Sequence, residues 1–120
     1  MDKTDICAYN RVVPAALRVA AFLARLATAL ASERVRITWK ADEELVELGW
    51  SHEDALARLA LLSAGDLLRT EEARDPGCST IWVFCPPAWE IDRHLWIRLA
   101  ESADETFVVS FHPARGDPWN

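Results

Sequence analysis

Two stretches near the end of the chain alternate polar with apolar side chains, and their polar positions have the types needed for chemistry. His94, Trp96 and Arg98 alternate with leucine and isoleucine, and Ser110 and His112 share one side of the last stretch. An imidazole exchanges a proton near neutral pH, an arginine binds phosphate through paired hydrogen bonds, and an exposed indole stacks on a base. Together these groups suit RNA cleavage without a metal, in which a 2′-hydroxyl attacks the neighbouring phosphate.

The same alternation is expected on the solvent face of any antiparallel sheet, so both interpretations stay open. The chain has no phosphate-binding glycine loop, no zinc-protease motif and no nucleophile elbow. Its three cysteines, Cys7, Cys78 and Cys85, form no CxxC pair, which argues against a disulfide framework and a zinc site. Reduced thiols in a cytoplasm are the simpler interpretation, and we expect neither metal nor cofactor.

The charge is unevenly distributed along the chain. The formal net charge is −6, with a balance of +4 over residues 1–40 and −10 over residues 41–120. This fits either a solvated acidic surface or a local basic patch on an acidic body, and it disfavours tight, unspecific nucleic-acid binding. The Ala/Leu-rich segment 14–31 contains Arg18 and Arg25, which argues against a membrane span. No export signal is evident, so we expect a cytoplasmic protein.

Three helices are expected in the first half of the chain. The first begins at Pro14 and has an apolar stripe at helical spacing. A short strand at 34–38 follows, and a second helix at 40–49 ends in glycine. Ser51 caps the third helix, and Gly65 breaks it.

From Asp66 onward, apolar residues recur with a period of two, which indicates strands. The expected strands are 66–72, 80–85, 94–100 and 106–112, with a turn at Asp75-Pro76-Gly77 and a charged loop at 90–94. The expected core sets are Leu95, Ile97 and Leu99 on one strand and Phe107, Val109 and Phe111 on the next. Short connections usually join antiparallel strands. The sequence therefore predicts an α+β fold: a small antiparallel β-sheet of about four to five strands with three helices packed on one face.

The chain from about Val35 to His112 resembles the MqsR family of type II toxins, relatives of the RelE-type mRNA interferases. The stretches that carry the resemblance are VRIT at 35–38, ELGW at 47–50, LSAGDLLRT at 62–70, TIW at 80–82, LWIRL at 95–99 and VVSFH at 108–112. They are collinear and cover about two-thirds of the chain. The region before Val35 matches least.

The resemblance implies one RelE-like toxin domain over residues 1–120. Within it, residues 1–33 form an N-terminal extension and helix, 34–112 the core, and 113–120 a tail. It also implies a type II toxin that cuts mRNA selectively without a metal and is held inactive by a cognate antitoxin protein. The alternative is a catalytically weakened binding module with the same fold, acting through an antitoxin or another partner.

The resemblance also points to site residues. Arg69 stands at a basic position of the family, Trp96 replaces a tyrosine, His112 replaces a terminal lysine, and Arg98 stands at another basic position. These four are the expected catalytic residues. Val83 replaces a glutamine, and so loses a polar contact. The residues expected to bind RNA beside them are His94, Arg93 and Ser110.

Overall fold

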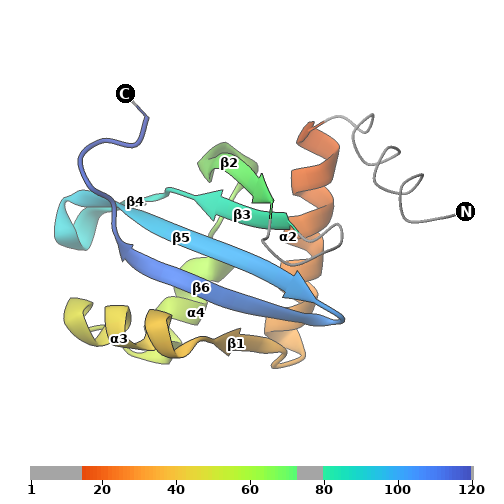
Figure 1. Cartoon of the computed structure of the whole chain (residues 1–120), viewed down its shortest axis with the longest axis horizontal. Helices are drawn as coiled ribbons and strands as arrows, with labels where there is room; N and C mark the ends of the chain where they lie inside the picture. Colours follow the sequence, from red (N-terminus) through yellow and green to blue (C-terminus); the bar gives the residue numbers. More distant parts are fainter. Residues whose placement is uncertain (1–14, 73–79, 120) are drawn as a thin grey trace, which may run out of the picture.

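The fold is a mixed sheet with helices against it, seen in a computed structural model that describes residues 15–72 and 80–119 (Figure 1). The strands are β1 (Val35–Ile37), β2 (Leu67–Glu72), β3 (Thr80–Phe84), β4 (Pro87–Ala88), β5 (Arg93–Ser102) and β6 (Glu105–Pro113). The helices are α2 (Ala15–Ala31), α3 (Trp39–Leu48) and α4 (His52–Ala60), with 3₁₀ turns η1 (Ala64–Asp66) and η2 (Trp89–Ile91). The predicted α+β class is confirmed. The expected turn at 75–77 lies outside the described residues.

Local sequence signals set the helix ends, two of which were predicted, at Gly49 and at Ser51. The predicted end of the third helix at Gly65 was wrong, because α4 already ends at Ala60 and Gly65 belongs to η1. Thr38 caps α3, because its hydroxyl oxygen accepts a hydrogen bond from the Ala41 N–H. Gly49 ends α3 with a φ of 77°, which favours glycine. Ser51 caps α4 as predicted, and it forms a capping box with Asp54.

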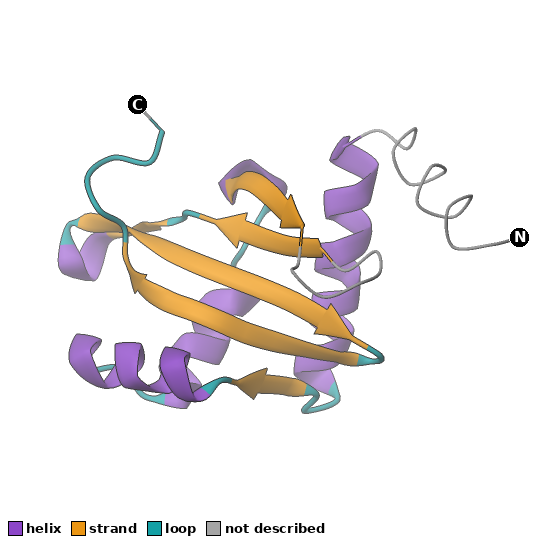
Figure 2. Ribbon diagram, viewed as in Figure 1, coloured by secondary structure: helices purple, strands orange, loops and turns teal. Residues whose placement is uncertain are grey.

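The helices α2 and α4 cover one face of the sheet, behind β5 and β6 in Figures 1 and 2. Phe22 of α2 is fully buried there, and its ring lies 4.6 Å from that of Trp82 and 5.9 Å from that of Phe84. Helix α3 instead runs beside the outer edge of β6, and its buried residues Ala41 and Leu45 join the same core. No helix in the described part of the chain is long and apolar enough to cross a membrane.

The sheet order is β1-β6-β5-β3-β2, with β4 paired to the start of β5. The pairs among β2, β3, β5 and β6 are antiparallel, as predicted. Strand β1 pairs with β6 in parallel, from Val35 opposite Thr106 to Ile37 opposite Val108. The expectation of a purely antiparallel sheet was therefore wrong for β1. This strand is followed by helices rather than by a hairpin, so no short connection constrains its direction.

An irregularity in the pairing of β5 with β6 changes the phase of the last strand. Arg98 lies opposite Ser110, but the next residue, Leu99, lies opposite Val108. Val109 is therefore an extra residue, as in a β-bulge. In a regular strand Val108 and Ser110 would face the same side, because side chains alternate. The extra residue between them places them on opposite faces of the sheet.

The bulge corrects the predicted core set of β6. Val108 and Phe111 are fully buried and Thr106 nearly so, whereas Phe107 and Val109 are only half-buried. Phe111 was thus assigned correctly, and Phe107 and Val109 were not.

The segment 90–94 also differs from the expected loop. It contains the end of η2, a turn at Asp92 with a φ of 53°, and the first residues of β5. The strand consequently begins at Arg93, opposite Ala88 of β4.

Replacing Phe22 with alanine tests this packing. We expect Phe22→Ala to lower the free energy of unfolding by about 3–5 kcal/mol, because it leaves a cavity against Trp82 and Phe84. Leu17 of the same helix is 62% exposed, so Leu17→Ala is the control and should change stability by only about 0.5 kcal/mol. Urea denaturation of both variants is the measurement, and equal stabilities would contradict the packing described.

Candidate active site

The face of the sheet opposite α2 and α4, here called the open face, carries a row of predicted site residues across four strands. Arg69 of β2 lies opposite Val83 of β3, Val83 lies opposite Arg98 of β5, and Arg98 lies opposite Ser110 of β6. Directly opposed residues in antiparallel strands have Cβ atoms only about 5 Å apart. The strand register therefore gathers side chains from distant parts of the sequence.

The next row contains the aromatic and imidazole groups. Trp96 of β5 lies opposite His112 of β6, and the Arg69 guanidinium lies over the Trp96 ring at 5.2 Å from its centroid. The Nδ1 of His112 lies 2.8 Å from the Pro113 carbonyl oxygen, to which it donates because a carbonyl can only accept. The Nε2 of His112 lies 3.7 Å from the Glu44 carboxylate. Arg69, Trp96, Arg98 and His112, the four predicted catalytic residues, thus share the open face.

Glu71 connects the two arginines. Its Oε1 accepts from Nε and Nη2 of Arg98 at 3.1 and 2.9 Å, and its Oε2 accepts from Nε and Nη2 of Arg69 at 3.2 and 3.0 Å. Desolvation alone would raise the pKa of Glu71, but the hydrogen bonds and charges of both arginines outweigh it and lower that pKa. The phosphate-binding groups predicted from the sequence are therefore already paired with a carboxylate.

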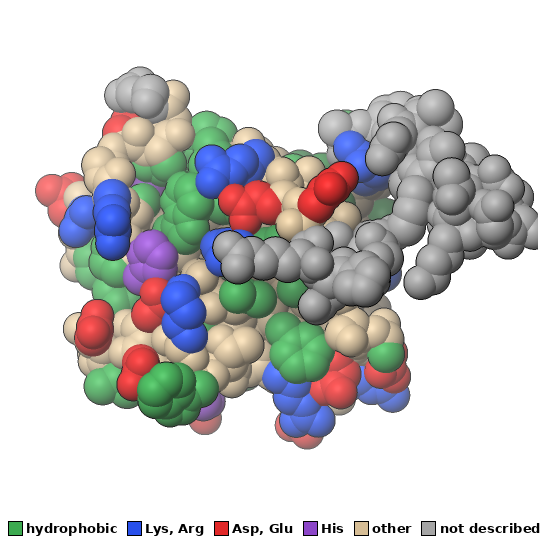
Figure 3. Space-filling model, viewed as in Figure 1, with side chains coloured by type: hydrophobic (Ala, Val, Ile, Leu, Met, Phe, Trp, Pro, Cys, Tyr) green, Lys and Arg blue, Asp and Glu red, His purple; other side chains and the backbone are tan. Residues whose placement is uncertain are grey.

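A second polar group, also not predicted, lies where α3 meets β6. The Lys40 Nζ donates to the Ser110 hydroxyl at 2.8 Å and lies 3.4 Å from the Glu44 carboxylate. The other Glu44 oxygen accepts the Phe111 N–H at 3.0 Å, which otherwise would face the open edge of β6. Figure 3 shows basic, acidic and histidine side chains gathered on this face. In the sequence, Lys40 and Glu44 form only an ordinary i,i+4 pair, which gives no signal of this contact.

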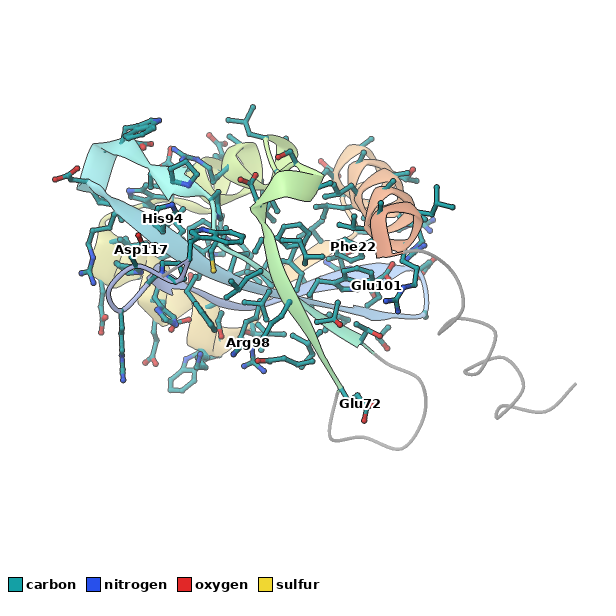
Figure 4. The ribbon with its side chains drawn as sticks, turned by 90° about the horizontal axis from the view of Figure 1, so that it is seen from above. Phe22, Glu72, His94, Arg98, Glu101 and Asp117 are labelled. Atoms are coloured by element: carbon teal, nitrogen blue, oxygen red, sulfur yellow. The ribbon has the colours of Figure 1, made fainter. Side chains whose placement is uncertain are left out.

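Two of the residues expected to bind RNA lie apart from this row. Arg93 alternates with His94 along β5, so its side chain starts from the other face, and its Nη2 donates to the Ala114 carbonyl at 2.5 Å. His94 faces the same way as Trp96 but lies at the β4 end of the strand, opposite Pro87. Figure 4 shows His94 beside the C-terminal segment at Asp117, away from Arg98.

The open face has an apolar base. Val83 is fully buried although it belongs to the row of arginines. Cys85 is buried too, and burial raises the pKa of its thiol to about 11 despite the opposing charge of Arg69, so the thiol stays protonated at neutral pH. The Trp119 indole donates to the Cys85 carbonyl at 3.2 Å. Cys7 and Cys78 lie outside the described residues, within which no cluster of metal-ligating side chains occurs.

Comparisons with protein-family models and with curated proteins found no match to this chain.

The lowered pKa of Glu71 gives a prediction for stability against pH. The folded state binds this proton less tightly than the unfolded state, so Glu71 stabilises the fold at neutral pH, and that contribution is lost as the pH falls through the lowered pKa. We therefore expect the difference in Tm between wild type and Glu71→Gln to be largest near pH 7 and to shrink towards pH 3.

Thermal melts across this range are the measurement. Glu72→Gln is the matched control, because it removes the same charge from the same strand and Glu72 forms no ion pair with any residue that the structure describes. A Tm difference for Glu71→Gln that does not change with pH would contradict the assignment.

Proposed function

We propose that this protein is the toxin of a type II toxin–antitoxin system and acts in the cytoplasm as a metal-independent, sequence-selective endoribonuclease on mRNA. Its partner in this proposal is a cognate antitoxin protein. The observation that carries the proposal is the strand register. It brings Arg69, Trp96, Arg98 and His112, four residues from three strands, onto one face.

The types and order of these groups support RNA cleavage. The guanidinium groups of Arg69 and Arg98 suit the phosphate and the negative charge that develops on it. Trp96 supplies an aromatic ring on which a base can stack, since it is half-buried and belongs to the open face. The Lys40 ammonium, bound to Ser110 opposite Arg98, adds positive charge to the same row.

In the proposed reaction, the 2′-oxygen forms a bond to phosphorus while the bond from phosphorus to the 5′-oxygen breaks. The proton of the 2′-hydroxyl passes to a base, and the departing 5′-oxygen takes up a proton, leaving a 2′,3′-cyclic phosphate. His112 carries out one of these two proton transfers, because imidazole exchanges protons near neutral pH. The Nδ1 bond to the Pro113 carbonyl fixes the ring and leaves Nε2 as the reactive nitrogen.

A second candidate function is a binding module without catalytic activity. The specific observation in its favour is Glu71, which pairs with both arginines of the site. The buried Val83 also favours this alternative, since it offers no polar contact to a substrate. In this alternative the open face binds an antitoxin or another protein, and growth inhibition would not require RNA cleavage.

RNA cleavage by the purified protein separates the two candidates. We expect single-turnover cleavage of a labelled RNA in excess chelator, with a 2′,3′-cyclic phosphate product, and a rate about 10²-fold lower or more for His112→Ala. His52→Ala is the control, because His52 is exposed on α4 and pairs with Asp42. Cleavage by the His112 variant at the wild-type rate would contradict the role of the imidazole.

Growth arrest on expression tests the arginines. We expect Arg69→Ala and Arg98→Ala each to relieve the arrest, because the phosphate loses a bidentate cation in either variant. Arg25→Ala is the matched control, since Arg25 binds Glu101 with two hydrogen bonds of 2.8 and 2.9 Å elsewhere on the molecule. Undiminished arrest by both site variants, at equal protein level, would contradict the assignment.

A further inference from the structure

Glu71 lies in the two-arginine site in the way that a bound anion would. Each of its two oxygens accepts a pair of N–H groups from one guanidinium, with Arg98 on one side and Arg69 on the other. Two guanidinium groups around one two-oxygen anion is also the arrangement in which arginines bind a phosphate. The carboxylate therefore stands in the position that the proposed RNA phosphate requires.

The strand geometry places Glu71 there specifically. An irregularity at the start of β2 leaves Leu68 without a partner and sets Arg69 opposite Val83, so Arg69 and Glu71 both face the open side. Glu72 alternates to the other side, and Figure 4 shows it at the far end of β2, away from Arg98. Glu71 and Glu72 thus carry the same charge on adjacent residues, but only Glu71 contacts the two arginines.

The Glu71 contact with Arg98 is also partly withdrawn from water. The exposed fractions are 27% for the Glu71 side chain and 30% for the Arg98 side chain, against 53% for Arg69. An exposed ion pair contributes little, but a partly desolvated pair of charge-assisted hydrogen bonds is stronger. A ligand that takes this place must therefore displace a tethered competitor.

We propose that Glu71 is an internal ligand of the two-arginine site, that an RNA phosphate must displace it, and that it thereby determines which anions bind. A tethered carboxylate has a high effective concentration, so a small free anion of equal charge competes poorly. A single-stranded RNA adds base stacking on Trp96, and so it can displace Glu71 where free phosphate cannot. This inference rests on the proposed function for the identity of the ligand.

A purely structural role for Glu71, as a link between β2 and β5, predicts a different effect of its removal on RNA affinity. If Glu71 only held the arginines in place, its loss would leave them less ordered, and RNA binding would weaken or stay the same. If Glu71 competes with phosphate, its loss must strengthen binding. The two interpretations therefore differ in the direction of the change.

The test is the affinity of the full chain for a short 2′-O-methyl RNA, which cannot be cleaved, measured by fluorescence anisotropy. We expect Glu71→Gln to bind about tenfold more tightly than Glu72→Gln, because both variants lose one negative charge but only the first frees the arginines. If Glu71→Gln does not fold, Glu71→Asp withdraws the carboxylate by one methylene and should also bind more tightly than wild type.

A separate titration uses inorganic phosphate and follows the arginine Nε–H signals by NMR. Together the two titrations distinguish failure of this proposal from failure of the proposed function. RNA binding by all variants with no gain for Glu71→Gln over Glu72→Gln would overturn this proposal and leave the proposed function standing. A gain for inorganic phosphate in Glu71→Gln, without RNA binding by any variant, would support the internal ligand and overturn the RNA function. Absence of both RNA and phosphate binding in every variant would overturn both.

Discussion

The antiparallel pairing of β5 with β6, with its extra residue at Val109, determines which side chains of the last strand reach the core and which reach the open face. Before the bulge, Thr106 and Val108 face the helices and form part of the core. After it, Phe111 returns to the core while Ser110 and His112 face the open side. The bulge thus lets one strand serve both the hydrophobic core and the polar row.

The open face balances its charges internally. Glu71 pairs with Arg69 and Arg98, and Glu44 lies within reach of Lys40 and His112. Such pairing stabilises the folded protein but reduces the charge available to a polyanion, a known conflict between stability and activity. In the proposed role, Glu71 is the carboxylate at which stability and RNA binding conflict. Removing the Glu71 carboxylate is therefore expected to lower stability at neutral pH and to strengthen RNA binding.

Local features of the fold were predictable because neighbouring residues determine them. Gly49 and Ser51 end one helix and begin the next through contacts within a few residues. The parallel pairing of β1 and the bulge at Val109 depend on residues far apart in sequence, and a period of two in the sequence carries no information about either.

The same distinction between neighbouring and distant residues applies to the candidate site. Ser110 and His112 were placed correctly because the bulge precedes them, and Arg98 because its own strand is regular up to that residue. Lys40 and Glu44 could not be predicted, since only packing of α3 beside β6 brings them to Ser110 and His112. The link from Glu71 to Arg98 spans two strand pairings, and the sequence offered no signal for it.

Side-chain NMR tests most directly the proposal that this protein binds RNA on its open face. A non-cleavable RNA is added to labelled protein while the arginine Nε–H and tryptophan indole N–H signals are followed. We expect the signals of Arg69, Arg98 and Trp96 to shift with RNA concentration, while those of Arg25 and the exposed Trp89 stay in place. Shifts confined to Arg25 or Trp89, with the signals of the open face unchanged, would contradict it.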